Sequence, residues 1–192
     1  MAEAELNGSG QRDRRKRIID ATIALADKGG FDAVQMRTVA ERADVALGTL
    51  YRYFPSKVHL LVAGLVRELE RIQDRLERSP VPGDTPYERL LVVLGRLTRA
   101  FQRNPNQAEA VTRALMSADT SAAAEVDAAN HLVTSMFIRI LAEGSPTDEQ
   151  VAIAGVISDV WLSNLVAWVT RRATASDVSH RLELTVRLLL RP

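Results

Sequence analysis

The stretch that most constrains the fold of this chain is residues 35–60, QMRTVAERADVALGTLYRYFPSKVHL. Its apolar residues predict two short helices, each with one buried face, and in the second helix Leu50 and Phe54 are spaced i and i+4. Asp44 lies where the chain must reverse, and aspartate tolerates a left-handed backbone better than most residues other than glycine. Two helices this short are not stable alone, so a third must pack across them. The segment therefore predicts a helix-turn-helix, a motif whose second helix can enter the major groove of DNA.

The rest of the sequence predicts further helices and no strand. Residues 1–10 are small and polar and are expected to be disordered, and a helix is expected from Arg12 to Gly29-Gly30. A long amphipathic helix starts at Ser56 and ends before the loop SPVPGDTP, residues 79–86. Later helices are expected near residues 87–103, 107–117, 126–141, 147–172 (opened by a Thr147/Gln150 capping box) and 177–190. The predicted fold is all-α, with a disordered tail (1–10), a three-helix helix-turn-helix domain (11–55) and a C-terminal helical domain (56–192).

The sequence lacks the patterns typical of catalysis or metal binding. Its three histidines, His59, His131 and His180, do not have HxxxH or HExxH spacing, and there is no serine nucleophile elbow or glycine-rich phosphate loop. The absence of cysteine excludes disulfides and thiolate ligands and fits a reducing cytoplasm. We therefore expect neither an enzyme nor a protein with a bound metal or a permanent cofactor.

Two segments bear on location. Residues 1–17 are polar and contain no apolar stretch of the kind found in signal peptides. Residues 151–169 are long and apolar enough to suggest a transmembrane helix, but Asp159 and Asn164 interrupt them, and a charge at mid-membrane costs several kcal/mol. We therefore expect a buried helix in a cytoplasmic protein, without a membrane partner.

The motif region resembles the N-terminal domain of TetR-type repressors. The matching residues are Val39-Ala40, Ala43-Asp44-Val45, Gly48-Thr49-Leu50-Tyr51, Tyr53-Phe54, Ser56-Lys57 and Leu60. Three positions depart from that pattern: Gln35 replaces a helix-capping Thr or Ser, Asp44 replaces a turn glycine, and Ala46 replaces a frequent Ser. Each lost cap costs roughly 0.5–2 kcal/mol. The resemblance implies a homodimeric repressor with a DNA-binding head and a C-terminal domain for effector binding and dimerisation.

Particular residues of the motif are suited to contact double-stranded DNA. Gly48 lets the backbone approach the duplex, Thr49 can reach a phosphate or a base edge, and Leu47 can contact a thymine methyl. Lys57 lies in the first turn of a helix, where a cation opposes the helix dipole unless a phosphate docks there; Arg37 is similarly placed in the preceding helix. The expected DNA-binding residues are Arg37, Ala46, Leu47, Gly48, Thr49, Tyr51, Arg52, Tyr53 and Lys57.

Some of these features have a second interpretation. Arg52 is equally suited to reading a guanine and to forming an ion pair. Tyr51 and Tyr53 are expected to project opposite Leu50 and Phe54 and to reach phosphates, although partial burial is the alternative. The basic run RDRRKR, residues 12–17, is suited to phosphate contact beside a helix-turn-helix, or is simply a solvated helix end.

Segments along most of the chain resemble one branch of the family, the repressors of cholesterol catabolism in steroid-degrading bacteria. These segments are DRRKRI, AVQMR, GTLYRYFPSKVHLLV, QRNP, ISDVWLSNL and AWVTRRA, between residues 13 and about 173. The resemblance implies a palindromic operator, sterol-degradation genes as targets and a steroid-derived CoA thioester as effector. Two alternatives stay open: a repressor that senses another hydrophobic effector, such as a fatty acyl-CoA or a drug, and a helical acyl-CoA or lipid carrier.

Large apolar residues on several C-terminal helices are candidates to line the effector pocket, although core packing is the alternative for each. Asn164 is a polar group that a ligand carbonyl could satisfy. Arg113, Arg171 and Arg172 could pair with phosphates of a thioester or be ordinary surface charges. The expected effector-binding residues are Phe101, Met116, Met136, Phe137, Trp161, Asn164, Leu165 and Trp168. The last two helices have apolar residues on more than one face, which favours a homodimer that pairs them in a four-helix interface.

Overall fold

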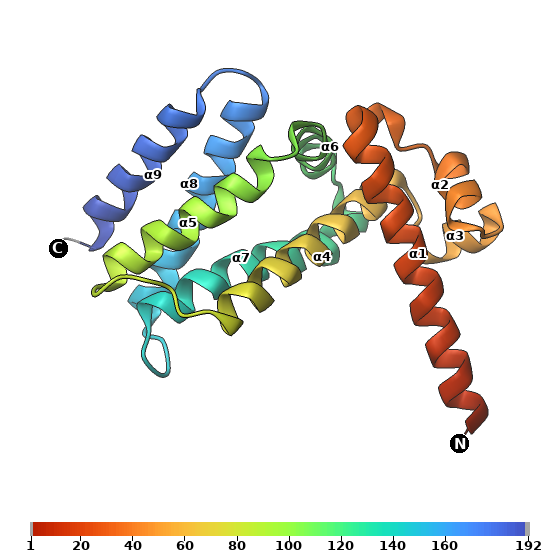
Figure 1. Ribbon diagram of the computed structural model, residues 1–192, viewed down its shortest axis with the longest axis horizontal. Coiled ribbons are helices and arrows are strands. Elements are labelled where there is room, and N and C mark those ends of the chain that lie inside the picture. Colours follow the sequence, from red (N-terminus) through yellow and green to blue (C-terminus); the bar gives the residue numbers. More distant parts are fainter. Residues whose placement is uncertain (1, 191–192) are drawn as a thin grey trace. The chain divides into compact units, whose positions relative to one another are not determined.

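The computed structural model describes residues 2–190, with side chains from residue 10 onward, and all regular elements in this range are helical (Figure 1). The elements are α1 (Ala2–Ala33), α2 (Met36–Ala43), α3 (Leu47–Tyr53), α4 (Lys57–Arg78), α5 (Pro86–Gln102), α6 (Pro105–Met116), the 3-10 turn η1 (Thr120–Ala122), α7 (Ala123–Leu141), α8 (Asp148–Val169) and α9 (Ala175–Leu190). The prediction of an all-α fold is confirmed. Helix α1 also includes residues 2–10, where the sequence analysis expects a disordered tail, while Met1 lies outside the described residues.

The chain forms two compact units that interleave in sequence. The first contains residues up to Leu65 together with Asn104–Val126, and the second contains Val66–Arg103 and the residues from Asp127 onward. Helix α6 thus belongs to the first unit, where it packs along α1, although all of α5 separates it from the helix-turn-helix in sequence. The chain crosses from one unit to the other three times: within α4, after Arg103 and within α7.

The helix-turn-helix of the first unit forms as its periodicity predicts. Val39 and Leu50, one from each short helix, are fully buried and share a core with Ile18 of α1. The turn places Asp44 at φ 54° and ψ 57°, which is the left-handed conformation expected there, and the amide of Val45 closes the turn by donating to the carbonyl of Ala40 at 3.0 Å. Neither α2 nor α3 has a side-chain hydrogen bond at its N-cap, so the expected loss of these caps is confirmed.

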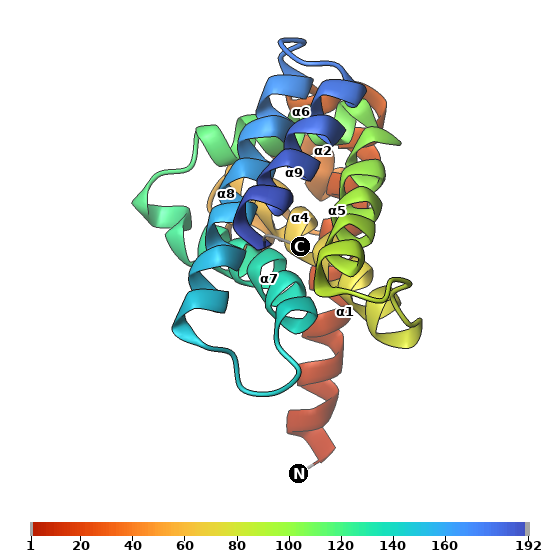
Figure 2. The same ribbon diagram turned by 90° about the vertical axis from the view of Figure 1, so that its left-hand side faces the viewer.

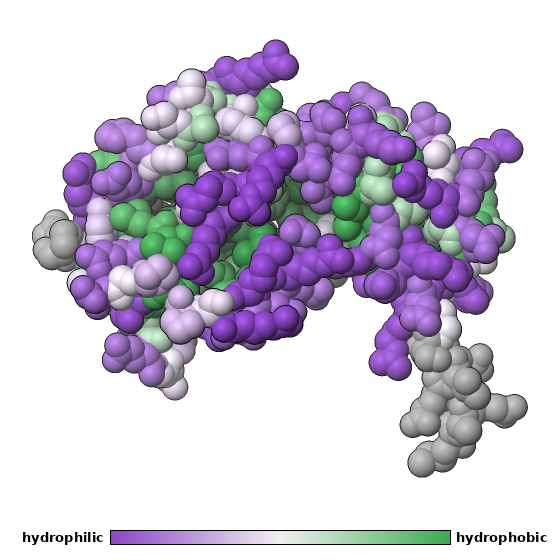
Figure 3. Space-filling model, viewed as in Figure 1, coloured by the Kyte–Doolittle hydropathy of each residue, from purple (hydrophilic) through white to green (hydrophobic). Residues whose placement is uncertain are grey.

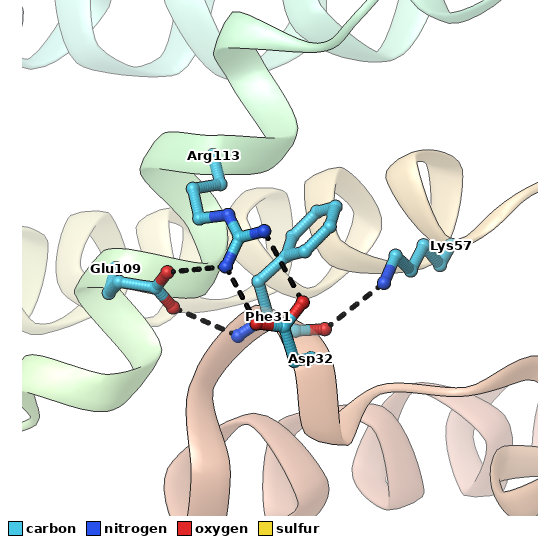
Figure 4. Close-up of polar contacts among 5 residues, drawn as sticks. All are labelled: Phe31, Asp32, Lys57, Glu109 and Arg113. Carbon is cyan, nitrogen blue, oxygen red and sulfur yellow. Dashed lines mark hydrogen bonds and ion pairs between the residues drawn. The ribbon is translucent and has the colours of Figure 1, made fainter.

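A polar cluster around Phe31 joins the end of α1 to α4 and α6; we call Phe31, Asp32, Lys57, Glu109 and Arg113 the Phe31 clamp (Figure 4). The Phe31 amide donates to Glu109 Oε2 at 2.9 Å, and its carbonyl accepts from Lys57 Nζ at 3.3 Å. Arg113 donates to Asp32 at 3.0 and 3.3 Å and to Glu109 at 3.0 Å.

Both cations of the clamp also contact the Phe31 ring. Lys57 Nζ lies 3.8 Å from the ring centroid, and Arg113 Cζ lies 4.4 Å from it. Both distances are within the range of cation–π attraction. Just before the ring, Gly30 adopts φ 65°, and a side chain there would meet the Glu109 carboxylate at 2.5 Å. The expected helix break at Gly29-Gly30 is therefore confirmed, and the break is what brings the Phe31 backbone to α6.

The second unit is built from helices that precede and follow the segment Asn104–Val126 in sequence. Helix α9 packs against both α5 and α8 (Figure 2). The fully buried side chains of the second unit include Leu90, Leu97, Phe137 and Ile157. The expected capping box at Thr147 is confirmed by its reciprocal hydrogen bonds with Gln150. Helix α8 is the only described helix long and apolar enough to cross a membrane, but Ile157 and other residues of one face are buried in this unit.

We expect the Asp32–Arg113 pair to make the stability of the first unit dependent on pH. The hydrogen bonds from Arg113, followed by its positive charge, lower the pKa of the Asp32 carboxyl below its ordinary value of 3.8. Because the folded pKa is the lower one, the stabilisation is complete above the unfolded pKa and is lost as pH falls through the folded pKa. Asp32→Asn should therefore destabilise the protein at pH 7, with a difference from wild type that shrinks below about pH 4.

Denaturant unfolding of wild type and Asp32→Asn from neutral to acidic pH measures this difference. The same substitution in an Arg113→Gln background is the control, because the partner of Asp32 is then absent and little difference should be left. A wild-type advantage that is constant across the whole pH range would contradict the assignment.

Candidate DNA-binding surface and effector cavity

Helix α3 contacts the first unit through the fully buried Leu50 and the half-buried Thr49 and Tyr53, and it presents its other residues to solvent. Leu50 is the only buried residue of the helix. Leu47 is 40% exposed and Tyr51 is 48% exposed, and Ala46, Gly48 and Arg52 are exposed as well. A short helix that exposes apolar and aromatic side chains on one face can contact a macromolecule without rearrangement.

Gly48 has no role in packing within the described structure. A Cβ atom at this position meets no atom within 4 Å apart from the neighbouring residues and the backbone of its own helix, and its backbone lies in a regular helix. Glycine in a helix costs about 1 kcal/mol relative to alanine. A glycine that the fold does not require is consistent with the expectation that the backbone here approaches a partner closely.

The two tyrosines of α3 differ in their surroundings. Tyr53 is half-buried and packs against the core of the first unit, with its ring centroid 6.5 Å from that of Phe54. Arg52 lies over the Tyr53 ring, with Cζ 5.9 Å from the centroid. Tyr51 is the more accessible of the pair, whereas Tyr53 is partly buried, which is the alternative to a phosphate contact. Thr49 is half-buried.

The structure separates Arg37 from Lys57, which the sequence analysis treats alike. The Arg37 side chain is 85% exposed and forms an ion pair with Glu41, one helical turn later, at 3.1 Å. Lys57 is half-buried and directs its ammonium at the carbonyl and ring of Phe31. An ammonium has three donors, so the bond to Phe31 leaves others for a second acceptor. In the basic run of α1, Arg15 is exposed and lies over the Phe54 ring at 5.5 Å.

Most of the expected effector-binding residues come together, but as packed core. Phe101 and Trp161 contact edge to face, with ring centroids 5.3 Å apart, and the Trp161 indole donates to Thr98 Oγ1 at 3.2 Å. Trp161, Leu165 and Trp168 border a crevice that has no room for a water molecule. Phe137 is fully buried, and Met136 lines a cavity described below. Met116 is not part of this group, because it belongs to the first unit and is 71% exposed.

Asn164 has an unsatisfied polar atom inside the second unit. Its amide nitrogen donates to the carbonyl of Val160 at 2.8 Å, whereas its Oδ1 is buried and has no hydrogen-bond partner. The carbonyl partner fixes which end of the amide is the nitrogen. The free atom is thus an acceptor, and a ligand hydroxyl or amide complements it better than the ligand carbonyl considered from the sequence.

The described part of the second unit contains two neighbouring cavities that share Leu76. Figure 3 shows a face of the protein on which hydrophobic side chains lie at the floor of a hollow and hydrophilic ones border it. The larger, open one has a volume of about 440 Å³, and its lining residues are Ile72, Arg75, Leu76, Arg78, Ser79 and Arg96. The smaller has a volume of about 130 Å³ and is lined by Gln73, Leu76, Val81, Val93, Met136, Arg139 and Ile140.

Apart from Met136, these lining residues are absent from the set expected from sequence. In sequence, the arginines of α4 look like the solvated side of an amphipathic helix, and only the fold reveals that Arg75 and Arg78 line a cavity together with Arg96 of α5. The arginines proposed from sequence lie elsewhere. Arg113 is part of the Phe31 clamp, Arg171 adopts φ 58° in the turn after α8, and Arg172 donates to Thr170 at 2.9 Å.

Comparisons with known proteins agree with this architecture. Residues 18–63 match the family described as bacterial regulatory proteins of the tetR family, and residues 83–189 match the tetracyclin repressor-like C-terminal domain. The HTH-type transcriptional repressor KstR of Mycolicibacterium smegmatis is 62% identical over 190 residues, which cover 99% of this chain and 93% of that protein.

Two solved structures show the same fold. A TetR transcriptional regulator from Rhodococcus sp. RHA1 has a TM-score of 0.87 and 29% identity, covering 94% of this chain and 97% of that one. FadR of Thermus thermophilus, a repressor crystallised with lauroyl-CoA, has a TM-score of 0.72 and 22% identity, covering 92% and 93% of the respective chains. These matches confirm the expectation of a transcriptional regulator rather than an enzyme: the chain belongs to the TetR family.

Proposed function

We propose that this TetR-family regulator is a cytoplasmic repressor of sterol or cholesterol catabolism genes, which binds a palindromic operator as a homodimer and is released by a hydrophobic effector. The observation that carries the proposal is the near-complete match to a KstR repressor at 62% identity, which spans the motif and the C-terminal helices alike. The segments that resemble cholesterol-catabolism repressors, between residues 13 and about 173, are likewise spread over both the motif and the C-terminal helices. The exposed outer face of α3 supports the DNA-binding part of the proposal.

On this proposal α3 enters the major groove. Leu47 and Gly48 face the bases, and Thr49 and Tyr51 reach the sugar-phosphate backbone. Arg37, almost fully exposed at the start of α2, reaches a flanking phosphate. Lys57 uses the donors not engaged by Phe31 for a second phosphate contact at the start of α4.

The homodimer is supported by apolar side chains that one subunit leaves exposed on its last two helices. Val156 of α8 is 47% exposed and Leu188 of α9 is 66% exposed. Pairing α8 and α9 with their copies covers these side chains in a four-helix interface, and a two-fold dimer presents two α3 helices to two operator half-sites. Light scattering that gives a monomer mass at micromolar concentration would exclude this assembly.

The proposed effector is a steroid-derived CoA thioester. The resemblance to cholesterol-catabolism repressors supports it, and the large apolar side chains of the second unit suit a hydrophobic ligand. The crystallisation of Thermus thermophilus FadR with lauroyl-CoA favours a second candidate, a fatty acyl-CoA. A carrier protein that binds such ligands but no operator is the alternative from another class.

Release requires that the effector prefer a conformation that binds DNA poorly. Helix α4 continues from the first unit into the second, and the chain crosses between the units at two further points. A ligand in the second unit can therefore act on the first through three covalent connections. A hundredfold loss of operator affinity requires about 2.7 kcal/mol of coupling.

The first test of this function is reciprocal coupling between operator and effector. Since linkage is symmetric, a saturating operator fragment should lower the affinity for the thioester by the same factor by which the thioester lowers operator affinity. Titration of a steroid-acid CoA thioester, with lauroyl-CoA in parallel, into free and operator-bound protein measures this factor. Equal ligand affinities in the two states would refute the coupling, and the absence of binding to a promoter fragment over scrambled DNA would favour a carrier.

Gly48→Ala should separate folding from DNA binding. Because no side chain or neighbouring element lies near the added methyl group, we expect the melting temperature to be unchanged or slightly higher, as alanine favours the helix over glycine by up to about 1 kcal/mol. Operator affinity should fall by roughly tenfold or more because the methyl group prevents close approach to the duplex. Gly144→Ala, in the loop between α7 and α8, is the control, since its added Cβ also meets nothing within 4 Å. Wild-type operator affinity in Gly48→Ala would remove this glycine from the interface.

Lys57 and Arg37 can be compared through the salt dependence of binding. If each holds one phosphate, Lys57→Gln and Arg37→Gln should each weaken operator and non-specific binding alike and flatten the log–log salt slope by about 1. Only Lys57→Gln should also lower the melting temperature, because only Lys57 belongs to the Phe31 clamp. A destabilised Lys57→Gln protein with an unchanged salt slope would assign Lys57 to the clamp alone.

A further inference from the structure

The larger cavity of the second unit combines an apolar floor with three guanidinium groups. Ile72 and Leu76 come from α4, and the cations are Arg75 and Arg78 near the end of the same helix and Arg96 of α5. We call this cavity the arginine groove. Its residues are not among those expected from sequence to bind the effector or its phosphates.

The positive charge of the arginine groove is only partly neutralised. Arg75 has its ion pair with Glu68 at 3.5 Å, but Arg71 shares that carboxylate at the same distance. Arg78 pairs with Asp74 at 3.6 Å, and both of these side chains are more than half exposed. Arg96, which is half-buried, forms no ion pair in the described part of the chain. The groove therefore retains a net positive charge beside apolar surface, an arrangement that an anionic ligand stabilises.

The smaller cavity extends this site with a different chemistry. It shares Leu76 with the groove and adds the apolar side chains Val81, Val93, Met136 and Ile140. Its own cation, Arg139, forms an ion pair with Glu77. The uncompensated charge thus lies on the groove side, and the apolar lining lies on the other side of Leu76. A ligand that fills both cavities is amphiphilic, with an anionic head and an apolar body.

We infer that the arginine groove binds the phosphate groups of a CoA thioester, with Arg96 as the principal contact, while the acyl part begins in the cavity beyond Leu76. One guanidinium group can donate two parallel hydrogen bonds to two oxygens of a phosphate. Two or three arginines around one groove therefore suit a pyrophosphate better than a single carboxylate. The inference deepens the proposed function and rests on its choice of a CoA thioester as effector.

The experiment compares Arg96→Gln with Arg99→Gln, a substitution one turn later on α5 at an exposed position outside the groove. Lauroyl-CoA, a steroid-acid CoA thioester, the two free acids and free coenzyme A are titrated into each protein. Arg96→Gln should bind both thioesters and free coenzyme A about tenfold more weakly, with a flatter salt dependence. Its affinity for the free acids and for operator should stay within about twofold of wild type. Arg99→Gln should match wild type throughout.

The outcomes distinguish this site from the proposed function. If the thioesters release operator from Arg96→Gln as efficiently as from wild type, the arginine groove does not bind the CoA phosphates, while the proposed repressor function stands. An equal loss of affinity for thioesters and free acids also overturns phosphate binding in the groove, because the defect is then not specific to phosphate. If no thioester releases operator but free coenzyme A binds in an Arg96-dependent manner, phosphate binding in the arginine groove is supported, and the proposal that a CoA thioester is the effector is refuted. Adding Arg78→Gln to Arg96→Gln should weaken coenzyme A binding further.

Discussion

Three helices of the first unit meet at the backbone of Phe31. The position of the helix-turn-helix depends on the hydrogen bonds that the Phe31 amide and carbonyl form. Its amide and carbonyl lie beyond the Gly29-Gly30 break and bond to Glu109 of α6 and Lys57 of α4. The ring lies between two cations that the same pair of helices supplies. The last residues of α1, the first turn of α4 and the middle of α6 are thus held by one residue. Since α2 and α3 come between Phe31 and Lys57, their ends are constrained by the same contacts.

Local features of the sequence were sufficient to predict the helices and the turn. The burial of Val39 and Leu50 follows from helical periodicity, and the left-handed Asp44 and the Thr147 capping box follow from residue types at fixed offsets. These features involve residues a few positions apart, for which sequence patterns are informative. The exposed positions of α3 follow in the same way, as the side of the helix opposite Leu50.

Contacts between residues distant in sequence could not be predicted in this way. Nothing near Phe31 indicates that its amide bonds to Glu109, and so neither the place of α6 in the first unit nor the ion pairs of Arg113 were expected. The same reason explains Met116, which has the composition of a pocket residue but is exposed. The sequence pattern predicts that an arginine on the polar side of an amphipathic helix is solvated. Such an arginine lines a cavity only where another helix packs nearby, as α5 does beside Arg75 and Arg78.

The interleaving of the two units restricts how such a protein can be recombined. If the DNA-binding part were a contiguous segment, a single junction after the motif would suffice to transplant it onto another sensor. Here α6 completes the first unit but is encoded between α5 and α7, so a single junction within α4 would bring together an α1 and an α6 from different parents. Glu109 and Arg113 would then have to fit a foreign glycine break and a foreign aromatic residue. Operator specificity in this architecture is therefore easier to exchange by replacing the exposed face of α3 than by swapping whole heads.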